Sequence, residues 1–120
     1  MAIVVAGGAG FIGINLIKEL FKKKSKIFLI DNFSNGKKEF ISTLKKFGDL
    51  HVIECDLSIE SNANKAINEI VNQSVSEIEL WHLAANSDIP SGTSNPRIDL
   101  KDTFMTTFNL LEMARIFGIN

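Results

Sequence analysis

Four glycines lie within seven residues near the start of the chain, in the segment Gly7-Gly8-Ala9-Gly10-Phe11-Ile12-Gly13. Because glycine has no Cβ atom, Gly7 or Gly8 allows a tight turn, and Gly10 allows the backbone to approach a phosphate closely. Gly13 would allow a following helix to lie against the preceding strand. The N-terminus of a helix offers free N–H groups and a partial positive charge, so this spacing predicts the binding of a pyrophosphate.

The sequence around these glycines has the order that such a site requires. Ile3-Val4-Val5 precedes them and is typical of a strand that is buried on both faces. Apolar residues at helical spacing follow them: Ile12, Leu16, Ile17, Leu20 and Phe21. The order strand, turn, helix predicts a dinucleotide site, and a glycine-rich turn needed only for packing is the alternative. A P-loop is disfavoured because Ile14 and Asn15 stand where Lys and Ser or Thr are required.

Acidic residues end two further predicted strands, 26–31 and 50–56. The carboxyl ends of parallel strands meet at one edge of a sheet, so Asp31 would face the adenosine ribose of a dinucleotide and accept hydrogen bonds from its hydroxyls. Its charge would repel the 2′-phosphate of NADP, which predicts NAD as the cofactor; the alternative is a turn or cap residue. Asp56 would accept a hydrogen bond from the adenine amino group, and Leu57 would pack on the adenine ring. The alternative is that Asp56 only caps a helix.

The rest of the sequence predicts more helices and a fourth strand. The expected elements are a helix with an apolar stripe at Phe40, Ile41, Leu44 and Phe47; a helix capped by Ser58 that continues to Val71; a strand over 78–85; and a helix that begins at Asn95-Pro96 and ends at Gly118. We therefore expect an α/β fold over residues 1–120. It would be a three-layer Rossmann-like sandwich with a parallel sheet of about four strands, truncated before a fifth strand.

Composition limits the kinds of partner and site. The formal net charge is −1, and no apolar run approaches the ~20 residues of a membrane span, so we expect no nucleic-acid or membrane partner. Cys55 is the only cysteine, which excludes an internal disulfide and favours a cytoplasmic location. His82 is expected to be a core histidine, and His51 and Cys55 lack further ligands. We predict no catalytic residue and no metal site.

With these motifs in view, the sequence resembles the extended short-chain dehydrogenase/reductase family, in particular NAD-dependent sugar-nucleotide epimerases and dehydratases such as the UDP-glucose 4-epimerases. The resemblance runs along the whole chain. It rests on the segments 6–13, 31–36, Asp56-Leu57, His82-Leu83-Ala84-Ala85 and 108–112. The family's sheet has the strand order 3-2-1-4-5-6, which we expect here for the first four strands.

The resemblance implies NAD as the cofactor and assigns residues to its parts. The pyrophosphate would lie at Gly7, Gly10, Phe11, Ile12 and Gly13. The adenosine side would contact Asp31, Asn32, Asn35 and Gly36, with Asp56 and Leu57 at the adenine. The nicotinamide half would contact Leu83, Ala84, Ala85 and Ser87. Thr103 stands where the family usually has an asparagine, and its hydroxyl is a further expected contact.

The family's catalytic residues have no counterpart in these 120 residues. Its members carry Ser or Thr and Tyr-x-x-x-Lys, followed by a sugar-nucleotide domain, whereas this chain contains no tyrosine. We therefore expect the N-terminal portion of such an enzyme, which binds NAD(H), is inactive alone and meets a nucleotide sugar only when the missing part is present. The alternative is a free-standing dinucleotide-binding module or half of a split enzyme. A sheet that stops after its fourth strand would leave the backbone of residues 78–84 unpaired, which predicts self-association there.

Overall fold

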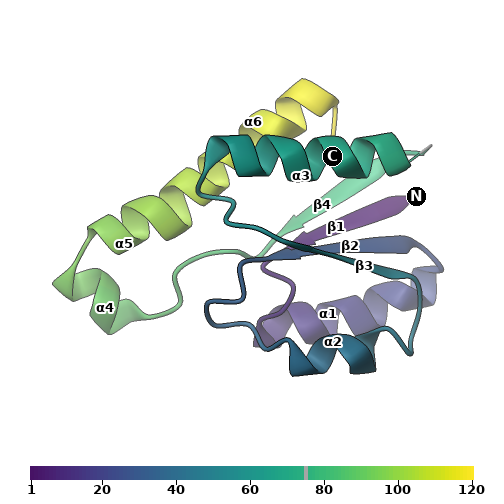
Figure 1. Ribbon diagram of the computed structural model, residues 1–120, viewed down its shortest axis with the longest axis horizontal. Helices are drawn as coiled ribbons and strands as arrows, with labels where there is room; N and C mark the ends of the chain where they lie inside the picture. The colour runs from purple at the N-terminus through teal and green to yellow at the C-terminus, as the bar shows by residue number, and fades with distance from the viewer. Residues whose placement is uncertain (75) are drawn as a thin grey trace.

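The computed structural model describes residues 1–74 and 76–120, and its centre is a parallel sheet of four strands (Figure 1). The strands are β1 (Ala2–Ala6), β2 (Lys26–Asp31), β3 (Leu50–Glu54) and β4 (Ile78–His82). Their order in the sheet is β3-β2-β1-β4, and every pair is parallel. The predicted fold class and strand order are confirmed.

The sheet separates two apolar cores. Val4 and Phe28 are register partners and point to one face, while their neighbours Ile3 and Ile27 point to the other. All five residues of β1 are buried, because helices cover both faces of this central strand. The period of two along each strand thus divides the apolar residues between the two cores.

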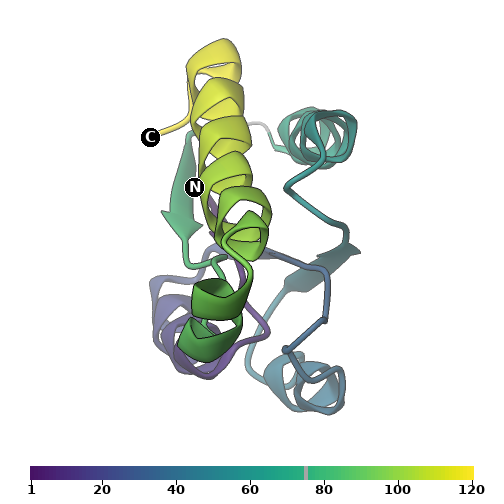
Figure 2. The same ribbon diagram turned by 90° about the vertical axis from the view of Figure 1, so that its left-hand side faces the viewer.

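Helices form the outer layers of the sandwich. On one face lie α1 (Phe11–Leu20), which ends in the 3₁₀ turn η1 (Phe21–Lys23), and α2 (Glu39–Leu44). On the other lie α3 (Glu60–Gln73) and α6 (Thr106–Phe117), as Figures 1 and 2 show. Between β4 and α6 the chain forms α4 (Ile89–Ser94), α5 (Arg97–Asp99) and the π-helical turn η2 (Leu100–Met105). Within the described residues, no helix is long and apolar enough to cross a bilayer.

Two strands are shorter than predicted, and one predicted cap is wrong. β3 ends at Glu54 and β4 at His82, so Asp56 and the residues after His82 lie in loops. The predicted N-cap Ser58 does not cap α3, which begins after Ile59 without a side-chain cap among the described residues. The Asp56 carboxylate binds both the N–H and the hydroxyl of Ser58, and this local turn competes with capping.

The helix α4 was not predicted, because Pro, Ser, Gly and Thr dominate its sequence. The Asp88 carboxylate nevertheless caps it by accepting a hydrogen bond from the Ser91 N–H (3.0 Å). The next helix begins near Asn95-Pro96 as predicted and ends at Gly118, whose φ of +64° is left-handed. Its interruption by η2 was not predicted.

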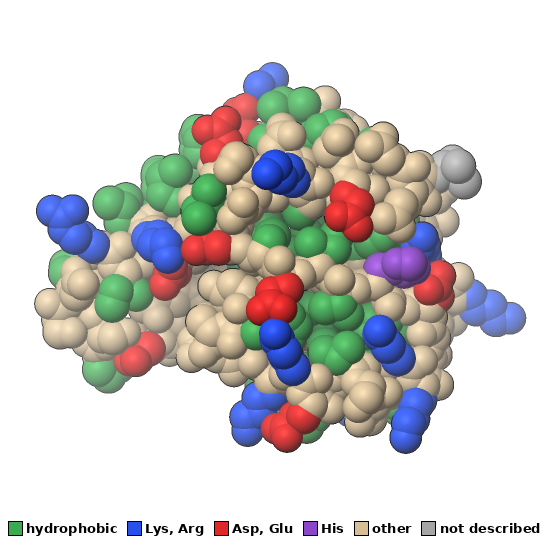
Figure 3. Space-filling model, in the orientation of Figure 1, with side chains coloured by type: hydrophobic (Ala, Val, Ile, Leu, Met, Phe, Trp, Pro, Cys, Tyr) green, Lys and Arg blue, Asp and Glu red, His purple; other side chains and the backbone are tan. Residues whose placement is uncertain are grey.

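The expected apolar stripe of α2 is only partly buried. Leu44 is fully buried and Ile41 packs against the core, whereas Phe40 and Phe47 are 41% and 55% exposed. Figure 3 shows hydrophobic groups at the surface along η2 and α6. The exposed apolar side chains of these two segments include Leu100, Phe104, Phe108 and Leu111. The long helix therefore contacts the sheet with one face and presents an apolar stripe on another.

The outer edge of β4 is not wholly unpaired, which corrects the expectation for residues 78–84. The Leu80 N–H donates to the Asn120 carbonyl (2.7 Å), and the Asn120 N–H donates to the Ile78 carbonyl (3.2 Å). The left-handed Gly118 ends α6 and turns the chain back, so that its last residue lies beside the strand. Asn120 therefore occupies the first half of this edge.

A buried asparagine joins α6 to the loop after β3. Asn109 is 2% exposed, and its side-chain amide donates to the Leu57 carbonyl (2.9 Å). Leu57 is itself buried and packs in the core between the sheet and the helices α3 and α6. This hydrogen bond fixes the position of the Asp56-Leu57 loop relative to the helix.

Replacing Asn109 with Leu removes this donor and leaves the Leu57 carbonyl without its partner. We expect the free energy of unfolding to fall by about 1–3 kcal/mol in urea denaturation, because an unsatisfied buried carbonyl carries its full desolvation cost. Asn64→Leu, at an exposed position of α3, is the matched control and should change stability by less than about 0.5 kcal/mol. Equal stability of the two variants would contradict this role of Asn109.

Candidate functional site

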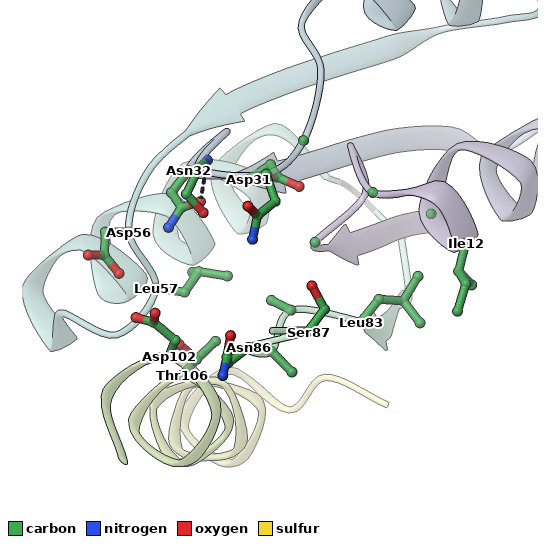
Figure 4. Close-up of a pocket in the computed structure, with 18 of the residues that line it drawn as sticks. Ile12, Asp31, Asn32, Asp56, Leu57, Leu83, Asn86, Ser87, Asp102 and Thr106 are labelled. Atoms are coloured by element: carbon green, nitrogen blue, oxygen red, sulfur yellow. Dashed lines mark hydrogen bonds between the residues drawn. The ribbon is translucent and has the colours of Figure 1, made fainter. Parts of the chain in front are cut away.

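A cavity of about 450 Å³ opens at the carboxyl ends of the strands (Figure 4). Its volume lies within the range of small-molecule and cofactor sites. With the exception of Thr103, the residues that the sequence assigned to a cofactor site all line it: Gly7, Gly10, Phe11, Ile12, Gly13, Asp31, Asn32, Asn35, Gly36, Asp56, Leu57, Leu83, Ala84, Ala85 and Ser87. Segments far apart in the sequence therefore meet in one site.

Two of the glycines are required by the protein's own packing. Gly7 has a φ of +77°, and a Cβ atom there would lie 2.6 Å from the Ala84 nitrogen. A Cβ atom on Gly13 would lie 2.6 Å from the Gly8 Cα atom. The turn can therefore approach the end of β4, and α1 can approach the turn, only with glycine at these positions. Packing thus requires Gly7 and Gly13, and both also line the cavity, so their expected contact with a cofactor stays a prediction.

Gly10 has no such requirement. Its φ is −76° and its ψ 172°, an extended conformation open to any residue. A Cβ atom there would meet only the Gly7 carbonyl oxygen within 4 Å, at an ordinary contact distance of 3.5 Å. Gly10 lines the cavity, so a side chain would occupy space in front of α1. A ligand that approaches the backbone closely would use this space.

The N-terminus of α1 faces the same cavity. Gly10 is its N-cap, and among the described residues no side chain caps the helix and no acidic residue lies in its first turn. The first N–H that bonds back to Gly10 is that of Ile14 (3.0 Å). The N–H groups of Phe11, Ile12 and Gly13 therefore remain available to an anion, and the helix dipole adds a partial positive charge.

Asp31 links the glycine turn to the end of β2. Its Oδ2 accepts a hydrogen bond from the Ala9 N–H (2.9 Å) and its Oδ1 accepts one from the Phe33 N–H (2.8 Å). Asp31 is therefore a turn residue, as the alternative held, and it stabilises Phe33 at an unusual φ of +56°. Each carboxylate oxygen keeps a second lone pair, so the carboxylate can still accept hydrogen bonds from ribose hydroxyls.

Asp56 and Leu57 line the cavity on the side of β3 (Figure 4). Burial alone would raise the pKa of Asp56, but hydrogen bonds from Ser58 and the nearby Lys101 ammonium outweigh burial and lower this pKa below its ordinary value. The Lys101 Nζ atom lies 3.3 Å from the Asp56 Oδ2 atom. Asp56 is thus ionised at neutral pH and can accept a hydrogen bond from an amino group.

Thr103 takes a different position from the one expected. Its hydroxyl oxygen accepts a hydrogen bond from the Asn86 N–H (3.0 Å), and it does not line the cavity. Five other residues of the cavity wall were not predicted as site residues: Ser34, Cys55, Asn86, Asp102 and Thr106. Asp102 and Thr106 could have been predicted, because residues four positions apart lie on the same face of a helix, here the helix after Pro96.

The remaining candidates for chemistry are structural. The Nε2 atom of His82 lies 2.8 Å from the Thr107 hydroxyl oxygen. His82 is only half-buried, and its Nδ1 atom is buried without a hydrogen-bond partner among the described residues, so the expectation of a satisfied core histidine is correct only for Nε2. Burial, with a smaller effect of the Asp56 charge, raises the pKa of the Cys55 thiol to about 11, so this thiol is a poor nucleophile at neutral pH. Across residues 1–74 and 76–120, no group of three or more His, Cys, Asp or Glu side chains is placed to hold a metal ion.

Solved structures share this arrangement. The UDP-Glc/GlcNAc 4-epimerase from Campylobacter jejuni superposes with a TM-score of 0.85 and 27% identity, over 99% of this chain and 35% of the epimerase. The Bordetella bronchiseptica enzyme WbmG, in complex with NAD, gives a TM-score of 0.80 and 26% identity over 99% of this chain and 35% of that one. The likeness covers the whole of the sheet and its helices.

Comparison of sequences also finds similarity to sugar-nucleotide epimerases along nearly the whole chain. A putative UDP-glucose 4-epimerase from Methanocaldococcus jannaschii is 29% identical over 118 residues, which are 98% of this chain and 35% of that protein. This chain thus spans about a third of the length of the proteins that it matches. The family model of GDP-mannose 4,6 dehydratase matches residues 4–120. The chain therefore belongs to this dehydratase family, within the extended short-chain dehydrogenase/reductase epimerases and dehydratases.

Proposed function

We propose that this chain binds NAD(H) and is the N-terminal, cofactor-binding portion of an NAD-dependent sugar-nucleotide epimerase or dehydratase. The space in front of Gly10 carries the proposal. A glycine that neither the backbone nor the packing requires lies at an uncapped helix N-terminus and lines the cavity. A pyrophosphate explains all three features, because it needs close backbone approach, free N–H donors and a positive field.

The two sides of the cavity suit the two halves of a dinucleotide. Asp31 and Asp56 offer carboxylate oxygens for ribose hydroxyls and an adenine amino group. The segment Leu83-Ala84-Ala85 offers small apolar side chains and backbone to a flat ring. NAD bound there would supply hydride transfer with a sugar substrate. WbmG contains NAD, and the names of the related epimerases describe UDP-sugars, which supports both parts of the proposal.

We further propose that these 120 residues alone catalyse neither epimerisation nor dehydration. The sequence contains no tyrosine, so it lacks the acid–base residue that the family resemblance implies. In this proposal, recognition and turnover of the nucleotide sugar belong to the rest of a longer protein. The same observation supports the second candidate, a dinucleotide-binding module without catalysis of its own. Measurable epimerase or dehydratase activity of the purified chain would contradict both.

We also propose self-association through the outer edge of β4, over a shorter stretch of this strand than the sequence predicted. Asn120 occupies this edge at Ile78 and Leu80, so pairing between copies would use the backbone beyond Leu80. We expect a reversible dimer in analytical ultracentrifugation, with a mass that rises as the protein is concentrated. A monomer at every concentration would exclude this pairing.

Replacing Gly10 with Ala tests the pyrophosphate site. The added methyl group meets no atom of the protein closer than 3.5 Å, so stability should change by less than about 1 kcal/mol. It would occupy the space of a bound phosphate, and we expect the affinity for NAD to fall by about a hundredfold or more in isothermal titration calorimetry. Gly7→Ala is the contrasting control, because its added methyl group would clash with Ala84 and strain the turn. Unchanged NAD affinity in a folded Gly10→Ala variant would contradict the site.

Replacing Asp31 with Ser tests the ribose assignment. The wild-type chain should bind NAD more tightly than NADP, because the carboxylate faces the 2′-phosphate as a like charge. In Asp31→Ser, the ratio of the two affinities should narrow by about tenfold or more. The variant also loses the hydrogen bonds to Ala9 and Phe33, so its stability is measured in parallel. The ratio of NAD affinity to NADP affinity compares two ligands on the same variant, so a general loss of stability does not change it. An unchanged ratio would exclude the contact of Asp31 with the ribose.

A further inference from the structure

Two sets of hydrogen bonds, which meet at Thr103, join the end of β4 and the loop that lines the cavity to one helical segment. The His82 Nε2 atom lies 2.8 Å from the Thr107 hydroxyl oxygen, and that hydroxyl donates to the Thr103 carbonyl (2.7 Å). A different group of the same residue, the Thr103 hydroxyl oxygen, accepts a hydrogen bond from the Asn86 N–H (3.0 Å). Thr103 lies in the π-helical turn η2 and Thr107 in the first turn of α6. The loop after His82 is thus held to this helix at Asn86.

The first set of bonds determines where the imidazole carries its proton. The single hydroxyl proton of Thr107 is donated to the Thr103 carbonyl, so the Thr107 oxygen can only accept from His82. His82 Nε2 must therefore carry a hydrogen, and in the neutral ring Nδ1 has none. The Nδ1 atom is buried and has no hydrogen-bond partner in the part of the chain that the structure describes.

The loop that these hydrogen bonds hold forms one wall of the cavity. Leu83, Ala84, Ala85, Asn86 and Ser87 all line it, and Figure 4 shows Asn86 and Ser87 beside the cavity. The Asn86 side chain also donates to the Asp88 carbonyl (3.0 Å) and to Asp99 Oδ1 (2.8 Å). Asn86 is therefore the point at which the loop is fixed to the helical segment after it.

We propose that neutral His82 is a positioning residue for the dinucleotide site, and that protonation of its Nδ1 atom releases the loop 83–88 and weakens nucleotide binding. A second N–H on this ring would be buried without an acceptor, which is costly. The protonated ring relieves this cost by moving toward water, and the movement breaks its bond to Thr107. The inference rests on the proposed function, because the ligand concerned is NAD.

In the part of the chain that the structure describes, no charged side chain contributes to the shift in the pKa of His82. β1, which pairs with β4, carries no titratable side chain. The elements around His82 carry these charged groups: Glu79 in β4, Asp88 in the loop, Arg97 and Asp99 in α5, Lys101 and Asp102 in η2, Glu112 and Arg115 in α6, and Glu60, Lys65 and Glu69 in α3. Burial is the only cause that shifts the pKa of His82, and it lowers this pKa below the ordinary 6.5. Binding should thus be strongest above pH 6.5 and weaken as the pH falls through the lowered pKa.

Four variants separate the hydrogen bond from the titration. His82→Gln keeps an N–H donor at similar reach but does not titrate, and His82→Leu removes the donor. Thr107→Ser keeps the hydroxyl, and Thr107→Val removes it. NAD affinity is measured by calorimetry at about pH 8 and about pH 5. Asn86 amide protection and the His82 ring tautomer are measured by NMR without nucleotide.

We expect wild-type affinity for NAD to fall about three- to tenfold from the higher to the lower pH, the value of one ordinary hydrogen bond. Thr107→Ser should behave in the same way. His82→Gln should bind as the wild type does at the higher pH and lose the pH dependence. His82→Leu and Thr107→Val should bind weakly at both pH values and lose protection of the Asn86 amide.

The two readouts distinguish failure of this inference from failure of the proposed function. A wild-type chain that binds NAD equally well above and below the pH at which the His82 ring titrates in the NMR spectra would overturn the inference alone. So would a His82→Leu variant with unchanged affinity. Loss of binding in His82→Gln equal to that in His82→Leu would also overturn it. If neither the wild-type chain nor any of the four variants binds NAD, the proposed function fails. The claim that His82 affects nucleotide affinity then fails with it. The Nε2–H tautomer and the Asn86 protection would then still test the anchoring of the loop.

Discussion

The close approach of the glycine turn to the ends of the neighbouring strands is the constraint on which the site depends. Hydrogen bonds join the end of β1 and the turn to both neighbouring strands. The Gly7 N–H donates to the Ile30 carbonyl at the end of β2, and the Leu83 N–H, just after β4, donates to the Ala6 carbonyl, each at 2.8 Å. No side chain fits at Gly7, because the Ala84 backbone occupies that space. β1, β2 and β4 therefore end together, and the N-terminus of α1 is held directly in front of them.

This geometry gives the cavity an uneven distribution of charge. The positive end of the α1 dipole lies at the glycine turn, the carboxylates of Asp31 and Asp56 lie at the ends of β2 and β3, and Leu83-Ala84-Ala85 adds an uncharged wall. A long ligand with an anionic centre and two different ends fits this pattern better than a compact anion or a metal ion. The carboxylates are held by backbone N–H groups of the protein itself, so little reorganisation is required on binding.

Local sequence patterns predicted the sheet, the glycine turn and the acidic residues at the cavity, and the family resemblance supplied the rest of the predicted cavity wall. β-branched runs define strands, glycines mark the turn, and acids at strand ends fall at one edge of a parallel sheet. The contributions of η2 and α6 could not be predicted in this way. Asn109, Thr103 and Thr107 are ordinary polar residues in the sequence, and their roles come from partners that are distant along the chain, Leu57, Asn86 and His82. The pairing of Asn120 with β4 likewise depends on a contact between distant segments. The helix α4 differs, because its cap by Asp88 and the proline after Ile89 are local signals that the sequence prediction did not use.

The central claim is that the pyrophosphate of NAD lies on the N-terminus of α1. The most direct test is a titration of ¹⁵N-labelled protein with NAD, followed by the chemical shifts of the backbone amides. We predict that the largest shifts occur at Phe11, Ile12 and Gly13, with smaller shifts at Asn32 and Leu57. Saturable binding with shifts confined to other surfaces, or the absence of shifts at millimolar NAD, would contradict it.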